Sequence, residues 1–178
     1  MIFKGLFKMP RKYLNPNTVK APKFKTEEEE FGLAKSGMAI CKGCGGYHYK
    51  KSWHHDAASF VAKREGKDVV MKFVLCPACQ MIRNGMYEGI VTVENVSPNI
   101  EEELFNLVKS YCRKAFLRDH QDRLIAVKKE GKKIIITLTE NQLAVKLAKK
   151  IGEVFNAEIK ITYSKEPADT SFVKIKFS

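Results

Sequence analysis

The sequence predicts an α+β fold with two modules: an N-terminal ribbon held by four cysteines, then an αββαββ domain with a four-stranded, largely antiparallel sheet. Two Cys-x-x-Cys pairs in the first half of the chain predict the ribbon. Apolar residues at helical spacing, each time followed by alternating segments typical of strands, predict the second domain. A length of 178 residues accommodates both.

Charge distinguishes this chain from an average globular protein. It carries 32 Lys and Arg against 20 Asp and Glu, a formal net charge of +12. An excess of this size favours a polyanionic partner, either nucleic acid or an anionic membrane surface. The apolar runs are far shorter than the roughly 20 residues that a spanning helix needs. We therefore expect a cytoplasmic protein without a membrane partner.

The first predicted region, residues 1–35, is a basic extended arm followed by an acidic connector. Residues 1–25 contain no acidic residue, and three prolines interrupt any helix. Such an arm can follow a phosphate backbone, although a solubilising tail would have the same composition. The four carboxylates of Glu27–Glu30 lie in the connector. The candidate RNA contacts of the arm are its seven cations: Lys4, Lys8, Arg11, Lys12, Lys20, Lys23 and Lys25.

The second predicted region, residues 36–97, contains two metal-binding turns. Cys41 and Cys44 form the first, and Cys76 and Cys79 form the second after 31 intervening residues. Zinc suits four thiolates in a tetrahedron, and a site closed by four protein ligands is structural rather than catalytic. An iron–sulfur cluster is the alternative. We therefore predict a zinc ribbon with one structural Zn²⁺, whose strands include residues 67–75 and 89–94.

The remaining cysteine and the histidines give no catalytic signal. Cys112 lies beside the apolar stripe of a predicted helix, so we expect it to be a small buried hydrophobe. His54, His55 and Asp56 could suggest a hydrolytic centre, but neighbouring side chains diverge and no acidic pair completes a catalytic set. We predict no catalytic residue and a protein that is not an enzyme.

Aromatic and cationic residues alternate after the first cysteine pair. This mixture suits stacking on unpaired bases while phosphates are neutralised. The same aromatic side chains are equally suited to form a small core over the metal. The candidate RNA contacts in this segment are Tyr47, His48, Lys50, Lys51, Trp53 and His54.

The third predicted region, residues 98–178, is the αββαββ domain. Pro98 in a first turn opens an amphipathic helix, and the segments 124–128 and 133–138 then predict a hairpin. A capping box beginning at Thr139 opens the second helix. Two further alternating segments complete the sheet, and both helices cover its apolar face. The lysines of the last strands suit either solvent or RNA.

A series of short motifs runs through both halves of the chain. In chain order they are Cys41-x-x-Cys44-Gly45, Trp53, Cys76-Pro77-Ala78-Cys79-x-x-Ile82, Tyr87-x-Gly89-x-Val91, Asp122-Arg123-Leu124-Ile125, Thr137-Leu138-Thr139-Glu140-Asn141-Gln142-Leu143-Ala144 and Ile151-Gly152. This series resembles the short prokaryotic members of the nonsense-mediated-decay type (NMD-like) zinc-ribbon family, which is associated with the large ribosomal subunit. The similarity covers residues 41–178.

The resemblance implies a zinc protein that binds the large ribosomal subunit or its RNA. With the charge, it predicts a non-enzymatic, zinc-dependent RNA-binding protein that acts in subunit maturation, hibernation or control of subunit joining. We expect ribosomal RNA and large-subunit proteins as partners, no small-molecule substrate, and a monomer when the protein is free. A zinc-ribbon DNA-binding factor of transcription or repair is the alternative.

Overall fold

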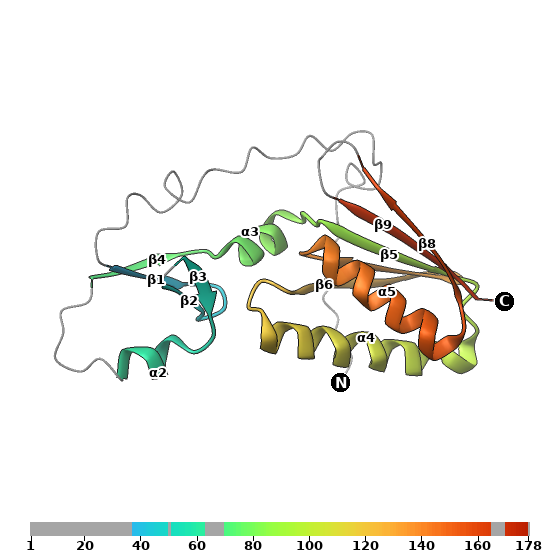
Figure 1. Ribbon diagram of the computed structural model, residues 1–178, viewed down its shortest axis with the longest axis horizontal. Helices are drawn as coiled ribbons and strands as arrows, with labels where there is room; N and C mark the ends of the chain where they lie inside the picture. Colours follow the sequence, from blue (N-terminus) through green and yellow to red (C-terminus); the bar gives the residue numbers. More distant parts are fainter. Residues whose placement is uncertain (1–36, 50, 63–69, 165–169, 178) are drawn as a thin grey trace.

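A computed structural model describes residues 37–49, 51–62, 70–164 and 170–177. They form two bodies arranged along the long axis of the molecule (Figure 1). We call residues 37–84 the cysteine module and residues 89–177 the sheet domain. The predicted arm and connector, residues 1–35, lie outside the described residues. So do eight candidate RNA contacts: Lys4, Lys8, Arg11, Lys12, Lys20, Lys23, Lys25 and Lys50.

The cysteine module is built on a four-stranded sheet with the order β3-β2-β1-β4. Strand β1 pairs antiparallel with β2 and parallel with β4. The parallel pairing places Cys41 opposite Val74, so the two cysteine turns emerge at the same end of the sheet. The elements are β1 (Gly37–Cys41), β2 (Tyr47–Tyr49), β3 (Ser52–His54), α2 (Ala57–Ala62), β4 (Val70–Val74) and α3 (Pro77–Asn84).

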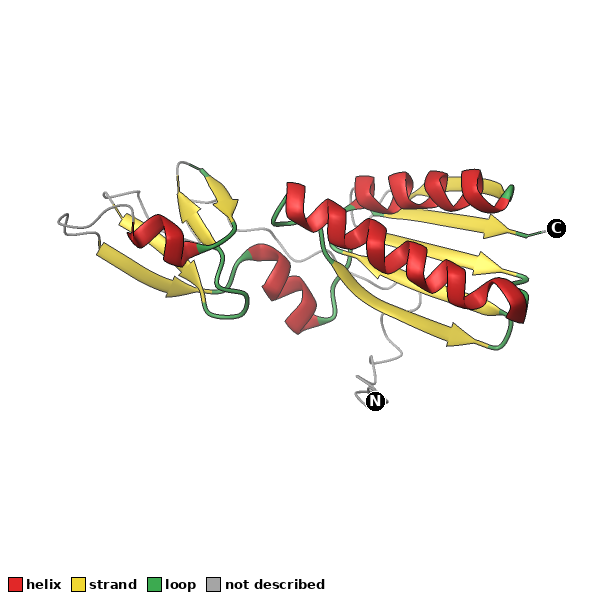
Figure 2. Ribbon diagram, turned by 90° about the horizontal axis from the view of Figure 1, so that it is seen from below, coloured by secondary structure: helices red, strands yellow, loops and turns green. Residues whose placement is uncertain are grey.

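The sheet domain has a five-stranded sheet with the order β6-β7-β5-β9-β8. Helices α4 and α5 lie together on one face of it (Figure 2). Both predicted helices and all four predicted strands of this half are present, so the mixed α+β class is confirmed. The elements are β5 (Gly89–Glu94), α4 (Pro98–Arg118), β6 (Leu124–Glu130), β7 (Lys133–Leu138), α5 (Asn141–Phe155), β8 (Glu158–Tyr163) and β9 (Ser171–Lys176).

Strand β5 corrects the predicted strand count. The zinc ribbon was expected to contain residues 89–94, but β5 is the central strand of the second sheet, between β7 and β9. The sheet therefore has five strands rather than four, and the sheet domain begins before residue 98. The physical reason is burial: Val91 and Val93 are fully buried in the core of the sheet domain.

The apolar core of the sheet domain lies between its helices and its sheet. Leu104 and Val108 of α4 meet Leu147 and Ile151 of α5 in one buried cluster. Cys112 belongs to this cluster, and burial raises the pKa of its thiol to about 12. The expectation of a buried, hydrophobe-like cysteine is confirmed. In the described part of the chain, no helix has the length and apolar character needed to cross a membrane.

The capping box predicted at the start of α5 does not form. Glu140 is the N-cap, and it makes no side-chain capping hydrogen bond. The buried Thr139 hydroxyl instead donates to the carbonyl of Gln121 (2.6 Å) and accepts from the amide of Arg123 (2.8 Å). Thr139 therefore fixes the loop between α4 and β6, residues 119–123, which we call the α4–β6 loop. This loop reaches the cysteine module.

Candidate metal centre

Four thiols converge where the two cysteine turns meet. The Sγ atoms of Cys41, Cys44, Cys76 and Cys79 all lie within 4.8 Å of one another, and all four cysteines are free thiols. The Sγ atoms of Cys44 and Cys76 are 3.8 Å apart. Four sulfurs that each lie 2.3 Å from a zinc ion occupy tetrahedral corners about 3.8 Å apart. The cluster therefore fits a single metal ion.

Backbone amides stabilise the sulfurs from both turns. Cys41 Sγ accepts from the amides of Cys76 (3.2 Å) and Gly43 (3.4 Å). Cys76 is the N-cap of α3, and its Sγ accepts from the amide of Cys79 (3.4 Å). Such donors favour the charged thiolate, which is the form that binds metal.

The thiols differ in acidity before a metal binds. Burial raises the pKa of Cys41, but the amides of Cys76 and Gly43 outweigh this effect and lower the pKa to about 7. Burial raises the pKa of Cys79 to about 12 and that of Cys76 further still. Cys41 is therefore the most acidic of these three thiols, and the charge of a bound ion would drive deprotonation of the cluster.

Gly43 lies in close contact with the second cysteine turn. A Cβ atom at this position would lie 3.1 Å from Cys79 Sγ and 3.3 Å from Leu75 Cδ2. The first cysteine turn therefore packs its backbone directly against the sulfur of the second turn. An alanine here would require one of these neighbours to shift by a few tenths of an ångström.

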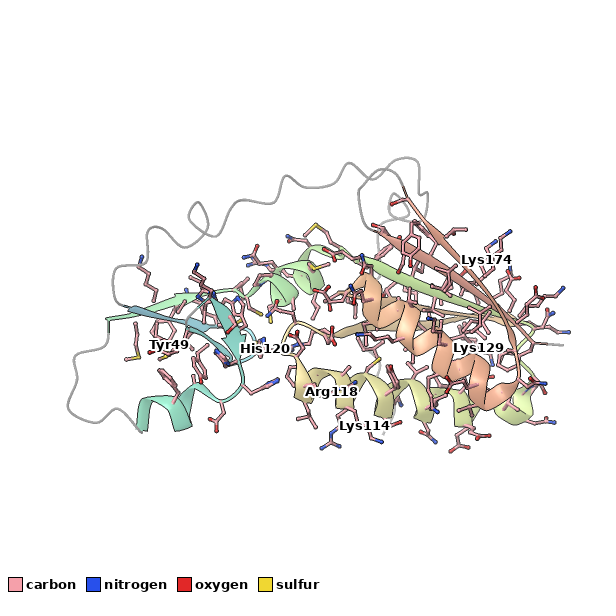
Figure 3. The ribbon with its side chains drawn as sticks, in the orientation of Figure 1. Tyr49, Lys114, Arg118, His120, Lys129 and Lys174 are labelled. Atoms are coloured by element: carbon pink, nitrogen blue, oxygen red, sulfur yellow. The ribbon has the colours of Figure 1, made fainter. Side chains whose placement is uncertain are left out.

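A histidine of the sheet domain reaches the sulfur cluster. His120, in the α4–β6 loop, is 2 % exposed, and its Nε2 lies 3.3 Å from Cys44 Sγ. Figure 3 shows His120 where the two bodies meet. Its ring stacks with Trp53 at 6.1 Å between centroids and lies 5.0 Å from the ring of His55. Burial and the charge of Arg123 lower the pKa of His120 to about 4, which keeps the ring neutral.

Sequence reasoning did not associate His120 with the cysteines. Local spacing gives no such signal, because His120 comes from a loop of the other body. Gly46, which follows the first cysteine turn, is the one residue type that leaves room for His120, because a Cβ atom at this position would overlap the His120 ring.

The described aromatic candidates pack among themselves in the cysteine module. Tyr47 contacts Phe60 at 4.5 Å between ring centroids and His54 at 5.1 Å. His48 packs on Trp53 at 5.4 Å. These rings are half-buried, while Lys51 is exposed. The structure thus places these rings in a small aromatic cluster, and their contact with RNA stays a prediction.

The histidine pair and Asp56 do not gather into a metal site. His54 Nε2 lies 2.9 Å from Ser52 Oγ and 3.2 Å from the Tyr49 carbonyl, and His55 packs edge-on against Phe116 of α4. Within residues 37–49, 51–62, 70–164 and 170–177, the four cysteines are the one group of three or more metal-ligating side chains.

A cationic surface that the sequence analysis did not single out runs along the second half of α4. We call its four residues the α4 cationic face: Lys109, Arg113, Lys114 and Arg118. All four are exposed. Arg113 and Lys114 lie on the side of the helix opposite the buried Val108 and Cys112, and Lys109 and Arg118 lie at the two edges of that side. Among the described residues, none of them forms an ion pair. Figure 3 shows Lys114 and Arg118 at the end of α4 that approaches the cysteine module.

This face has a signal in the sequence. After Glu103, helix α4 contains no acidic residue, and its cations recur at spacings of four and five residues. The sequence prediction for this helix rests on its apolar stripe, which identifies the core.

The predicted lysine-bearing face of the last strands also forms. Lys160 and Lys174 are opposite each other on β8 and β9, and both are exposed. Lys176 is opposite Glu158, so charges of both signs occur on this face. It is therefore less uniformly basic than α4.

Comparisons with known proteins add no family to this geometry. No family model matches the chain, and a search of curated proteins also finds no match. The structure by itself gives a mixed α+β chain in which Cys41, Cys44, Cys76 and Cys79 lie close enough together to hold a metal ion.

Proposed function

We propose that the protein is a non-enzymatic, zinc-dependent RNA-binding protein associated with the ribosome through its large subunit. The α4 cationic face is the observation that carries the proposal, because it presents four exposed cations with no ion-paired acid among the described residues. Maturation, hibernation or control of subunit joining are the proposed roles. The family resemblance of the sequence motifs supports this choice of partner.

The metal centre supports a structural role for zinc. Four thiolates saturate a tetrahedral ion, so no position is left for a reacting water. A cluster of several irons and sulfides would hold its cysteines farther apart than a single ion does, and the 3.8 Å between Cys44 and Cys76 Sγ suits the single ion. In this proposal, zinc holds the fold of the cysteine module while other surfaces contact RNA.

The position of the α4 cationic face suits a phosphate backbone. Its cations occupy successive turns, so they can meet several phosphates along one strand. The arm would add seven further cations from residues 1–25. Neutralising each phosphate contributes roughly 0.7 to 0.9 to the salt dependence of binding. Four contacts on α4 therefore correspond to a slope of roughly 3.

Cosedimentation with ribosomes on sucrose gradients at rising salt tests the proposal. The full chain should migrate with the large subunit at low salt and leave it as salt rises. Absence from the large subunit even at low salt would contradict the proposal. Nucleic acid recovered from native purification distinguishes the alternative, because a DNA-binding factor would carry DNA instead of RNA.

Two charge-matched variants test the α4 cationic face itself. One replaces Lys109, Arg113, Lys114 and Arg118 with Gln, and its control replaces four exposed lysines elsewhere in the sheet domain with Gln: Lys132, Lys146, Lys149 and Lys150. Both lose four positive charges. The first should reduce the salt slope by roughly 3, and the control should reduce it far less. Equal reductions of the salt slope in both variants would show that binding depends only on net charge.

Deletion of residues 1–25 should weaken RNA or ribosome binding independently of the α4 cationic face, while both bodies stay folded.

A further inference from the structure

The α4–β6 loop contacts both cysteine turns. His120 Nε2 lies 3.3 Å from Cys44 Sγ in the first turn. Gln121 Oε1 accepts a hydrogen bond of 3.1 Å from the amide of Ala78, which lies between Cys76 and Cys79 in the second turn. One short loop of the sheet domain therefore touches each of the two chain segments that would hold the metal.

Gln121 favours a proton on the His120 nitrogen beside Cys44. Its Oε1 is occupied by the amide of Ala78, so its Nε2 is the atom that faces His120 Nδ1, 3.1 Å away. An amide NH₂ group only donates, so this contact needs Nδ1 as the acceptor. In that tautomer the proton is on Nε2, the nitrogen beside Cys44 Sγ.

Arg123 adds positive charge to this contact. Its Nε donates to the carbonyl of His120 (2.8 Å), and its guanidinium lies 4.1 Å from the ring centroid of Phe116. These two contacts hold its Nη2 3.1 Å from His120 Nε2. A guanidinium only donates, so this contact by itself favours Nε2 as the acceptor. A neutral ring cannot accept at both nitrogens, so the Arg123 and Gln121 contacts favour opposite tautomers. A thiolate at Cys44 adds the acceptor that favours a proton on Nε2.

The loop has little freedom to place His120 elsewhere. Thr139 holds the carbonyl of Gln121 and the amide of Arg123, and Asp119 Oδ1 accepts from the amide of Gln121 (2.8 Å). On the other side, Gly46 leaves the space that the ring fills. The ring is 2 % exposed, so water does not compete for the contact with Cys44.

We infer that His120 Nε2 donates a hydrogen bond to the metal-bound thiolate of Cys44, and that the metal thereby fastens the sheet domain to the cysteine module. A thiol is a weak acceptor, whereas a thiolate is a charged and stronger one. Metal binding therefore strengthens a contact between the two bodies, and metal loss weakens it. The inference requires an ion in the four-cysteine site and does not depend on RNA binding.

Metal affinity of two variants of the full chain tests the donor. His120→Phe keeps an aromatic ring but has no N–H, and His120→Gln keeps a side-chain N–H near the Nε2 position. Outer partners of metal ligands typically contribute 10–100-fold to affinity. In competition between zinc and a chelator, His120→Phe should bind zinc about 10–100-fold more weakly than the wild type, and His120→Gln should recover much of the loss. Wild-type affinity in His120→Phe would overturn the inference.

Hydrogen exchange of the wild-type chain provides the second test, which needs no variant to fold. Zinc-loaded and chelator-treated protein are compared. On metal removal the amide of Ala78, which donates to Gln121 Oε1 across the two bodies, should lose protection, while those of β5, β7 and β9 keep theirs. Unchanged protection of the Ala78 amide would contradict a metal-dependent fastening. Failure of the wild type to bind zinc at all would instead overturn the metal site.

Discussion

The cysteine module and the sheet domain obtain their stability from different sources. The sheet domain has one apolar core that joins both helices to the sheet. The buried cluster around the sulfurs consists of Cys41, Cys76 and Ala78, with Trp53 and Leu75 packed against it. So small a core stabilises little, and a bound ion must supply much of the folding free energy. The two bodies should therefore respond to different perturbations.

Loss of a metal ligand should have the largest effect, confined to the cysteine module. We expect Cys76→Ser to abolish stoichiometric zinc and to remove on the order of 10 kcal/mol of binding-coupled folding free energy. Metal analysis and hydrogen exchange of β1 and β4 measure both losses. Cys112→Ala is the matched control, because this thiol is buried in the core of the other body, and it should retain one zinc. A cysteine module that stays folded without metal in Cys76→Ser would contradict the claim that the ion supplies much of its folding free energy.

A core truncation should act on the other body. Leu147 is fully buried between α5 and the sheet, so Leu147→Ala should lower the free energy of unfolding of the sheet domain by about 2–5 kcal/mol. Denaturant unfolding followed in the zinc-loaded protein measures the change. Zinc stoichiometry should stay at one, since no sulfur is touched. Loss of zinc would show that the cysteine module cannot form its site without an intact sheet domain.

The smallest effect concerns pH. Burial, followed by the charges of Glu88, Asp122 and Asp119, raises the pKa of Glu140 from 4.5 to about 7. The protonated form is favoured by folding, so its stabilisation is complete below pH 4.5 and disappears as pH rises through about 7. Glu140→Gln should therefore be more stable than the wild type at pH 8, on the order of 1–2 kcal/mol because the side chain is only half-buried.

Thermal melts at pH 4 and pH 8 measure this difference. The two proteins should melt alike at pH 4, where the carboxyl is protonated in both the folded and the unfolded chain. If the difference in melting temperature between the wild type and Glu140→Gln were the same at both pH values, the raised pKa of Glu140 would be contradicted. Zinc should be kept saturating at pH 8, and the sheet-domain transition should be followed, because the cysteine ligands themselves release zinc in acid.

The parts of the fold that the sequence predicts are those with a local signal. Helices α4 and α5 and strands β6 to β9 follow from apolar periodicity, and the cysteine spacing places the four sulfurs together. Strand β5 was assigned to the wrong sheet because alternation identifies a strand but not its neighbours. Its partners β7 and β9 are chosen by the shared core of Val91 and Val93 with both helices.

Contacts between the two bodies had no local signal. His120 lies in a loop whose sequence resembles any polar connection, and its role depends on the space at Gly46. The hydroxyl of Thr139 satisfies a capping pattern, yet the α4–β6 loop offers it two stronger backbone partners. In both cases the partner is a residue that only the fold brings close.

Helix α3 has a mechanical consequence. Its first turn carries Cys79 and is capped by Cys76, and it ends at Gly85, shortly before β5 begins at Gly89. An eight-residue helix spans about 12 Å. A metal ion bound at one end of this rod would fix the orientation from which the chain enters the central strand of the sheet domain. The ion would then lie at the base of this rod, and residues 85–88 link its other end to β5.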